Sequence, residues 1–180
     1  MRLGKFLCAL IVACVLLAAG CRQGSGGNAN GDAPASPPRA KEAAALPDSG
    51  FKALITVDGA PSKLRAGQKE TIQVKVKNAS DVQWYSRGGE VNSNPDNRFY
   101  LAAGNRWMKA DGQTLVTNMD GRHGIQRDLK PGEEEEVPLQ VTAPKEPGEY
   151  VLEIDLIQEQ VAFFSDKGSQ TAKLKITVVK

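Results

Sequence analysis

The segment Thr71-Ile72-Gln73-Val74-Lys75-Val76-Lys77 has an apolar residue at every second position and a polar or charged residue between them. Successive side chains of a β-strand point to opposite faces, so this pattern predicts a strand with one buried and one solvated face. The same alternation runs through residues 150–156, where Glu153 and Asp155 are expected to point outward, and through residues 173–178. These three segments favour an antiparallel β-sheet fold.

Weaker strand patterns and glycine turns continue this organisation over the C-terminal part of the chain. The weaker strands are expected at residues 54–57, 82–85, 98–102 and 137–141. The expected turns, each with a glycine able to adopt positive φ, are Ala66-Gly67, Asp111-Gly112, Asp120-Gly121, Pro131-Gly132 and Pro147-Gly148. About seven short strands separated by turns predict that residues 49–180 form one all-β domain, an immunoglobulin-like antiparallel β-sandwich. Residues 88–97, rich in Gly, Asn and Pro, are expected to form a long exposed loop.

The N-terminus has the features of a secretory signal. Arg2 and Lys5 precede an apolar run over residues 6–19, which is shorter than the ~20 residues that a bilayer-spanning helix needs. The sequence Leu17-Ala18-Ala19-Gly20-Cys21 resembles a lipobox, in which a peptidase cuts before a cysteine that carries lipid. We therefore expect a lipoprotein signal peptide over residues 1–20 and lipid attachment, palmitate included, at Cys21. The alternative is an ordinary signal peptide that contains a cysteine.

The segment after this cysteine has the composition of a tether. Residues 21–48 are dominated by Gly, Ser, Asn, Ala and Pro and are expected to form a flexible, disordered linker. The chain has 23 Lys and Arg against 21 Asp and Glu, and signal cleavage removes Arg2 and Lys5, which leaves a neutral mature chain. A neutral chain without a basic stripe disfavours nucleic acid as a partner.

A series of short motifs carries a resemblance to a known domain family over residues 82–179. In chain order the motifs are Asn105-Arg106-Trp107, Asp111-Gly112, Asp120-Gly121-Arg122, Leu129-Lys130-Pro131-Gly132-Glu133, Ala143-Pro144, Pro147-Gly148-Glu149-Tyr150, Asp155-Leu156-Ile157-Gln158-Glu159 and Val161-Ala162-Phe163-Phe164-Ser165. Together they resemble the immunoglobulin-like accessory domain found beside bacterial glycosyltransferases and methyltransferases of surface-polysaccharide synthesis. Gln160 stands where that family more commonly has glycine, and Phe163 stands where it more commonly has tryptophan. The resemblance implies the fold and an accessory role, not sugar transfer.

Residues suited to catalysis or metal binding are scarce in the mature chain. His123 is the single histidine and is expected to be a solvent-exposed turn residue, while the only remaining cysteine is the acylated one. Zinc needs several His or Cys ligands, and the oxygen ligands Asp111, Asn118 and Asp120 lack the regular spacing of a calcium loop. We therefore expect no catalytic residue, no cofactor and no metal. A hydrolase with a carboxylate pair is the least favoured alternative.

Large aromatic residues and arginines concentrate near the middle strands. Trp84, Tyr85, Arg106 and Trp107 are the candidate partner-binding residues, because flat rings beside guanidinium groups suit a sugar or a protein surface. The competing interpretation is that Trp84 and Trp107 pack in the core of the sandwich. Tyr150 is expected in the core with its hydroxyl bound to nearby backbone, as in a tyrosine corner.

These observations favour a lipid-anchored protein of the cell envelope that works as a non-enzymatic binding or interaction module. Its expected partners are the membrane, through the lipid, and an envelope protein or a glycan. The main alternative is a glycan-binding accessory protein for surface polysaccharide. Arg22 follows the cysteine where Asp commonly signals inner-membrane retention in enterobacteria, so the outer membrane is the expected location.

The lipid-anchor hypothesis predicts the outcome of one substitution. Cys21→Ser should abolish labelling by a radioactive or alkyne-tagged fatty acid and leave an uncleaved or mislocalised precursor, because the thiol that accepts the lipid is gone. Labelling and fractionation of wild-type and variant cells measure this. Lipid label that persists on the variant, or wild-type protein found solely in the inner membrane, would contradict the hypothesis.

Overall fold

The computed structural model describes residues 44–91 and 96–180. The predicted signal peptide, Cys21 and most of the predicted linker lie outside these residues. Nine strands and two short 3-10 helices make up the described part. In chain order they are η1 Asp48–Gly50, β1 Ala53–Val57, β2 Lys63–Arg65, β3 Lys69–Asn78, β4 Leu101–Lys109, β5 Leu115–Gly124, β6 Glu134–Thr142, β7 Gly148–Gln158, β8 Ala162–Phe163, η2 Ser165–Lys167 and β9 Ala172–Val179.

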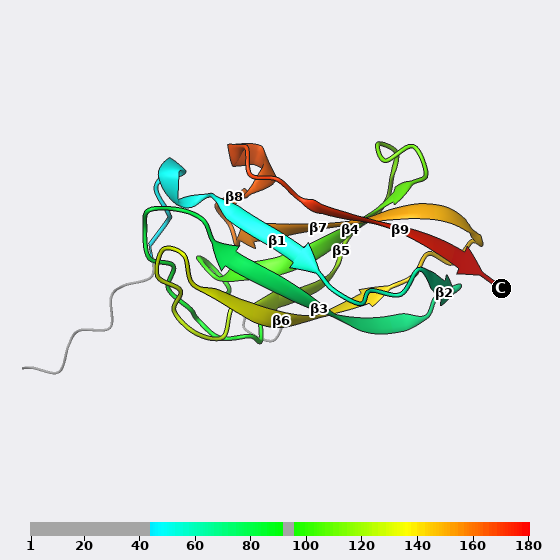
Figure 1. The fold of residues 1–180 in the computed structure, drawn as a ribbon, viewed down its shortest axis with the longest axis horizontal. Helices are drawn as coiled ribbons and strands as arrows, with labels where there is room; N and C mark the ends of the chain where they lie inside the picture. The colour runs from blue at the N-terminus through cyan, green and yellow to red at the C-terminus, as the bar shows by residue number, and fades with distance from the viewer. Residues whose placement is uncertain (1–43, 92–95) are drawn as a thin grey trace, which may run out of the picture. The chain divides into compact units, whose positions relative to one another are not determined.

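The strands form two sheets that pack face to face (Figure 1). The smaller sheet has the order β1-β3-β6, and the larger sheet has the order β2-β9-β7-β4-β5, with β8 paired to β7. All neighbouring strands are antiparallel except β2 and β9, which run parallel. The domain is therefore an immunoglobulin-like β-sandwich, and the predicted fold class is confirmed.

The alternation that predicted the fold also defines its core. In β3, the side chains of Ile72, Val74 and Val76 are buried while Thr71 and Gln73 are exposed. Leu152, Ile154 and Leu156 in β7 point into the same core from the opposite sheet. Each sheet thus contributes one apolar face, and burial of these faces at ~25 cal/mol per Å² drives their association.

The weaker strand predictions are only partly correct. Residues 82–85 form no strand, because only Trp84 pairs with another segment, in an isolated bridge to Leu129. The strand expected at residues 98–102 begins at Leu101 and continues to Lys109. Asp120-Gly121 is not a turn but lies inside β5. Gly67, Gly112 and Gly132 adopt positive φ as predicted, whereas Gly148 is already the first residue of β7.

A bulge in β5 closes one side of the sandwich. Pairing of β5 with β4 shifts register between Gly104 and Arg106, and Met119 adopts a positive φ of 54°. The bulge brings Gly121 against the carbonyl oxygen of Gln140 in β6, where a Cβ atom would overlap that oxygen. This close approach joins strands of opposite sheets.

Hydrogen bonds of polar side chains also hold β5 against β6. The side-chain oxygen of Asn105 accepts a hydrogen bond from the N–H of Gly121 at 3.0 Å, and its amide donates to Asp120. The second carboxylate oxygen of Asp120 accepts from the N–H of Thr142 in β6 at 2.6 Å. Asn105 is buried, so these bonds satisfy an amide that would otherwise be costly in the interior.

Tyr150 forms the predicted tyrosine corner. Its side chain is buried in the core, and its hydroxyl donates a hydrogen bond to the carbonyl oxygen of Glu146 at 2.8 Å. The bond ties the start of β7 to the turn that precedes it. The hydroxyl group of this buried side chain is thereby satisfied by a hydrogen bond to nearby backbone.

The last residues of the predicted linker belong to the domain. The amide of Gln158 accepts from the N–H of Leu46 at 2.8 Å and donates to the carbonyl oxygen of Ala44 at 3.0 Å. Leu46 also packs against the core. The predicted boundary after residue 48 is therefore several residues too late for the described part of the chain.

The close approach at Gly121 makes a matched pair of glycine substitutions informative. Gly121→Ala should lower the free energy of unfolding by about 1–3 kcal/mol, because the new methyl group meets fixed backbone. Gly104→Ala should cost less, because the new methyl group meets the end of the Met119 side chain, which can move. Urea denaturation of both variants measures the difference. Equal losses would show that β5 and β6 are not held together at Gly121.

Candidate functional site

Trp84 lies in the core and not on a partner-facing surface. Its side chain is 0% exposed, and its indole N–H donates to the carbonyl oxygen of Gly50 at 2.9 Å. Its ring meets the edge of Phe164 at a centroid distance of 5.3 Å. Although residues 82–85 form no strand, Trp84 forms an isolated bridge with Leu129 and its ring packs in the core.

Trp107 is also a core residue. It points inward from β4, is 0% exposed and packs edge to face against Tyr150 at 6.3 Å. The hypothesis that Trp84 and Trp107 face a partner is therefore wrong, and the competing interpretation of core packing is correct. The physical reason is that alternate residues of β4 point inward, and Arg106, the neighbour of Trp107, points outward.

The remaining two candidates lie in different places. Tyr85 is half-buried and lines an apolar pocket of about 520 Å³ together with residues 44–47 and 82–83. Arg106 lines a separate hollow on the outer face of the larger sheet. The four candidate residues therefore do not form one surface. In the predicted loop at residues 88–97, Val91 is buried, so the described part of the loop is not fully exposed. Residues 92–95 lie outside the described part.

The outer face of β7 carries buried acids. Glu153 and Asp155 point away from the core as the alternation predicts, but they are 8% and 2% exposed rather than solvated. Asp155 contacts the segment formed by β8 and η2, because the hydroxyl of Ser165 in η2 donates a hydrogen bond to its carboxylate at 2.5 Å. The Thr171 hydroxyl donates to Glu153 at 2.8 Å. The predicted outward direction of Glu153 and Asp155 is therefore correct, but the prediction that they are exposed to solvent is wrong.

Arg106 is fixed in position by these acids and by an aromatic ring. Its guanidinium group donates to Asp155 at 3.1 Å and lies 3.8 Å from a carboxylate oxygen of Glu153. The same group lies 4.4 Å above the centre of the Phe163 ring. Phe164 points to the opposite face, into the core, as expected for adjacent residues in an extended segment. An arginine held by carboxylates and a ring is pre-organised for recognition.

A shallow hollow beside this arginine is the candidate functional site. We name it the Arg106 groove; it has a volume of about 350 Å³ and is lined by Arg106, Met108, Leu115, Asn118, Phe163 and Asp166. Leu115 is 52% exposed, and its neighbour Val116 is also exposed. The groove thus combines apolar side chains with an arginine, an amide and a carboxylate, the mixture from which binding surfaces are built.

A second buried ion pair lies further along the same face. Glu159 is 3% exposed, and Arg122 donates to its carboxylate at 3.1 Å. One oxygen of Glu159 and the Nε of Arg122 have no hydrogen-bond partner among the described residues. Burial raises the pKa of Glu159, and the charge of Arg122 opposes that rise. Burial likewise raises the pKa of Asp155, against the effects of Ser165 and Arg106.

The candidates for catalysis and metal binding among the described residues are few. His123 lies within β5 and is half-buried against Gly89, so the prediction of an exposed turn residue is wrong. Within residues 44–91 and 96–180, no three His, Cys, Asp or Glu side chains gather as metal ligands would. No helix in this part of the chain has the length and apolar composition needed to cross a bilayer.

Comparisons with known proteins give only distant likenesses. No family model matches the chain, and no curated protein sequence matches it. The CARDB domain of the PF1109 protein from Pyrococcus furiosus, solved in complex with di-metal ions, is 16% identical, with a TM-score of 0.39 over 71% of this chain and 91% of that chain. The sporulation control protein Spo0M from Bacillus subtilis is 15% identical, with a TM-score of 0.40 over 72% of this chain and 49% of that chain. A PapD-like domain of human CEP192 is 10% identical, with a TM-score of 0.29 over 75% of this chain and 88% of that chain. Likenesses at this level carry no information on ligand or function.

The sequence contained one indication of this site besides its aromatic residues, namely two acids inside an apolar strand. Glu153 and Asp155 alternate with Leu152, Ile154 and Leu156 in a run flanked by apolar residues on both sides. Acids inside such a run indicate a strand that is buried on both faces and needs a cationic partner. The other groove residues are brought together only by the β4-β5 hairpin and the β8 segment, so their spacing in the sequence gave no signal.

The raised pKa of Glu159 predicts a change of stability with pH. The folded chain holds this proton more tightly than the unfolded chain, so stability is gained as the pH falls through the folded pKa toward the unfolded value near 4.5. Glu159→Gln removes this titration. The free energy of unfolding of the wild type should therefore rise relative to that of the variant as the pH is lowered toward about 4.5.

Urea denaturation over a pH series measures this difference, and subtraction of the two curves cancels the titration of Asp155. Glu149→Gln, at an exposed position of β7, is the control that shows whether the difference is specific to Glu159. A difference for Glu159→Gln that stays constant or reverses its sign would contradict the assignment.

Proposed function

We propose that this chain is a lipid-anchored protein of the cell envelope whose β-sandwich binds a partner protein and performs no chemistry itself. The observation that carries this proposal is the Arg106 groove. Its arginine is fixed by Asp155, Glu153 and Phe163 on a rigid sheet, while Leu115 stands exposed at its side. Arginine is among the residue types enriched at binding hot spots.

Binding is favoured over catalysis because the acids of this face already have partners. Asp155 accepts from Ser165 and Arg106, and Glu153 contacts Arg106, Thr171 and Lys173. Both carboxylates are almost fully buried. A hydrolytic pair would need access to substrate and water between its two carboxyl groups, and this pair serves to hold an arginine instead.

A protein partner is favoured over a glycan at this site because neither tryptophan reaches the surface and the Phe163 ring of the groove lies under Arg106. Trp84 and Trp107 are fully buried, and Arg106 lies over the ring of Phe163. The exposed apolar residue of the groove is Leu115, while Val116, the next residue of β5, lines a different hollow with Lys145 and Tyr150. Aliphatic side chains with a charged rim suit a protein surface better than a sugar ring.

The proposed lipid anchor would determine where in the cell the protein is located. Lipid on Cys21 would hold the chain at the membrane, with the outer membrane favoured by Arg22. Gln158 binds the backbone of residues 44–46, so the tether meets the domain at the C-terminal end of β7. A groove on a tethered domain binds its partner at a raised effective concentration near the membrane.

Site-specific photocrosslinking in intact cells tests the proposal. A photoreactive residue at Leu115 should give a discrete protein adduct, and the same residue at Gln73, exposed on the outer face of the smaller sheet, should not. Asp166→Lys, which reverses the charge at the exposed rim of the groove, should reduce the Leu115 adduct several-fold without changing the thermal melt. Equal adducts from both positions, a glycan-dependent adduct, or no adduct at Leu115 would contradict a protein-binding groove.

A further inference from the structure

An aspartate that is followed by glycine can react with its own backbone. The amide nitrogen of the glycine attacks the carboxyl carbon of the aspartate side chain, and glycine permits this approach because it has no side chain and few conformational restrictions. The chain contains three such pairs, Asp58-Gly59, Asp111-Gly112 and Asp120-Gly121, and the structure describes all of them. The two reacting residues are the same in each pair, so the surroundings decide which pair reacts.

Hydrogen bonds hold both partners of the Asp111-Gly112 pair. The carboxylate of Asp111 accepts from the hydroxyl of Thr114 at 2.6 Å and from the N–H groups of Thr114 and Gln113, both at 2.8 Å. The bond from the Thr114 hydroxyl, together with those from the two N–H groups, lowers the pKa of Asp111 to about 2. The N–H of Gly112 donates to the carbonyl oxygen of Lys109 at 2.8 Å. The carboxyl group therefore stays ionised, which makes it a poor electrophile, and the attacking nitrogen is held elsewhere.

The Asp120-Gly121 pair is held inside β5. The carboxylate of Asp120 accepts from the side-chain amide of Asn105 and, through its other oxygen, from the N–H of Thr142 at 2.6 Å. The N–H of Gly121 donates to the side-chain oxygen of Asn105 at 3.0 Å, and its Cα lies against the backbone of β6. Attack of this nitrogen on the carboxyl carbon would require the contact between β5 and β6 to open.

The Asp58-Gly59 pair lies in the connection between β1 and β2 and lacks these restraints. Both residues are exposed, and Gly59 has a φ of 67° with no atom within 4 Å of the position that a Cβ would take. Within the described residues, neither the carboxylate of Asp58 nor the N–H of Gly59 has a hydrogen-bond partner. Both the carboxyl carbon and the attacking nitrogen are therefore free to approach each other.

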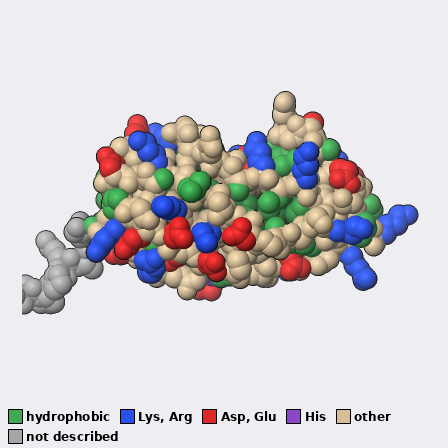
Figure 2. Space-filling model, viewed as in Figure 1, with side chains coloured by type: hydrophobic (Ala, Val, Ile, Leu, Met, Phe, Trp, Pro, Cys, Tyr) green, Lys and Arg blue, Asp and Glu red, His purple; other side chains and the backbone are tan. Residues whose placement is uncertain are grey.

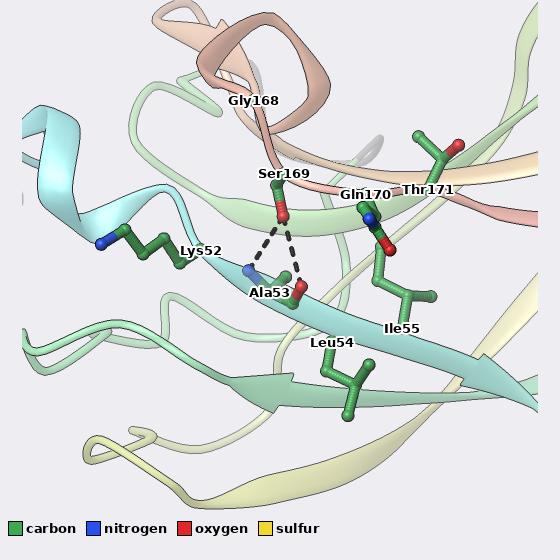
Figure 3. Close-up of a pocket in the computed structure, with 8 residues that line it drawn as sticks. All are labelled: Lys52, Ala53, Leu54, Ile55, Gly168, Ser169, Gln170 and Thr171. Atoms are coloured by element: carbon green, nitrogen blue, oxygen red, sulfur yellow. Dashed lines mark hydrogen bonds between the residues drawn. The ribbon is translucent and has the colours of Figure 1, made fainter.

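The strand that leads into this pair is well anchored up to its last residue. At the beginning of β1, the hydroxyl of Ser169 accepts from the N–H of Ala53 at 3.0 Å and donates to the carbonyl oxygen of the same residue at 3.2 Å (Figure 3). Pairing with β3 continues to Val57, one residue before Asp58. The face that carries β1 has acidic and basic side chains at its surface (Figure 2). The regular hydrogen bonding of β1 thus ends directly before the pair, at an exposed position that water can reach.

We propose that Asp58 is a site of spontaneous modification, at which the chain forms a succinimide with Gly59 and then isoaspartate. In the first step the nitrogen of Gly59 bonds to Cγ of the protonated Asp58 carboxyl group, a C–O bond breaks, and the hydroxyl leaves with the amide proton as water. In the second step solvent water attacks the backbone carbonyl carbon of Asp58 and breaks its bond to the Gly59 nitrogen. The chain then runs through the side-chain carbon of residue 58, whereas water attack at Cγ restores aspartate.

The modification lengthens the connection between the two sheets by one backbone atom. The strand before the connection, β1, belongs to the smaller sheet, and the strand after it, β2, belongs to the larger sheet. The pair does not line the Arg106 groove. The inference therefore goes beyond the proposed binding function and does not depend on it.

Peptide mapping of the full-length chain in detergent tests the proposal. The folded protein is incubated at mildly acidic pH, digested with trypsin and analysed by electron-transfer fragmentation, which distinguishes isoaspartate from aspartate. Trypsin releases Asp58 within residues 53–63 and the other two pairs together within residues 110–122. Isoaspartate should form at Asp58 about tenfold faster or more than at Asp111 or Asp120, because those two pairs must first break hydrogen bonds.

Two controls separate the effect of structure from that of sequence. The same incubation in urea removes the folded structure, so the three pairs should then react at similar rates. Thr114→Val removes the hydroxyl that binds Asp111 and should raise the rate at Asp111 while the rate at Asp58 stays unchanged. The proposal is overturned if the folded chain forms isoaspartate equally at all three pairs, if Asp58 stays unmodified while the urea-treated chain reacts, or if Thr114→Val leaves the rate at Asp111 unchanged.

Discussion

Burial of β7 on both faces is the constraint on which the rest of the structure depends. All residues from Tyr150 to Gln158 are buried, although alternate ones point away from the core. On the inner face, apolar side chains pack against the opposite sheet. On the outer face, Glu153 and Asp155 are removed from water, and such charges are costly unless they are paired and hydrogen-bonded. Arg106 supplies the pairing, and Ser165 supplies a further hydrogen bond at 2.5 Å.

This arrangement links stability to the candidate site. The same contacts that compensate the buried acids hold the Arg106 guanidinium group at the border of an open groove, 3.1 Å from Asp155 and stacked on Phe163. The arginine therefore needs little ordering when a partner binds, which lowers the entropic cost of association. The short β8-η2 segment has two roles, since it carries the ring under the arginine and the hydroxyl that binds Asp155. A change in this segment would alter the fold and the groove together.

Local patterns predicted the fold well, and tertiary contacts limited the prediction of the site. The alternation in β3 and the Pro147-Gly148 pair just before Tyr150 are local features, so one buried face and the tyrosine corner followed from sequence. The bulge in β5 breaks the alternation of apolar and polar residues, so the sequence pattern did not predict this strand. Burial of Trp84 and of Asp155 depends on segments distant in the chain. Gln160, noted as standing where glycine is commoner, has a φ of 60°, the conformation that glycine adopts without strain.

A double-mutant cycle between Arg106 and Asp155 tests most directly whether the buried acid holds the groove arginine in place. The free energies of unfolding of the wild type, Arg106→Ala, Asp155→Ala and the double variant give the coupling energy of the pair. The contact at 3.1 Å between two largely desolvated groups predicts a favourable coupling of about 1–3 kcal/mol. A coupling near zero would show that the two side chains act independently, and would contradict the view that β7 both stabilises the sandwich and positions its candidate binding surface.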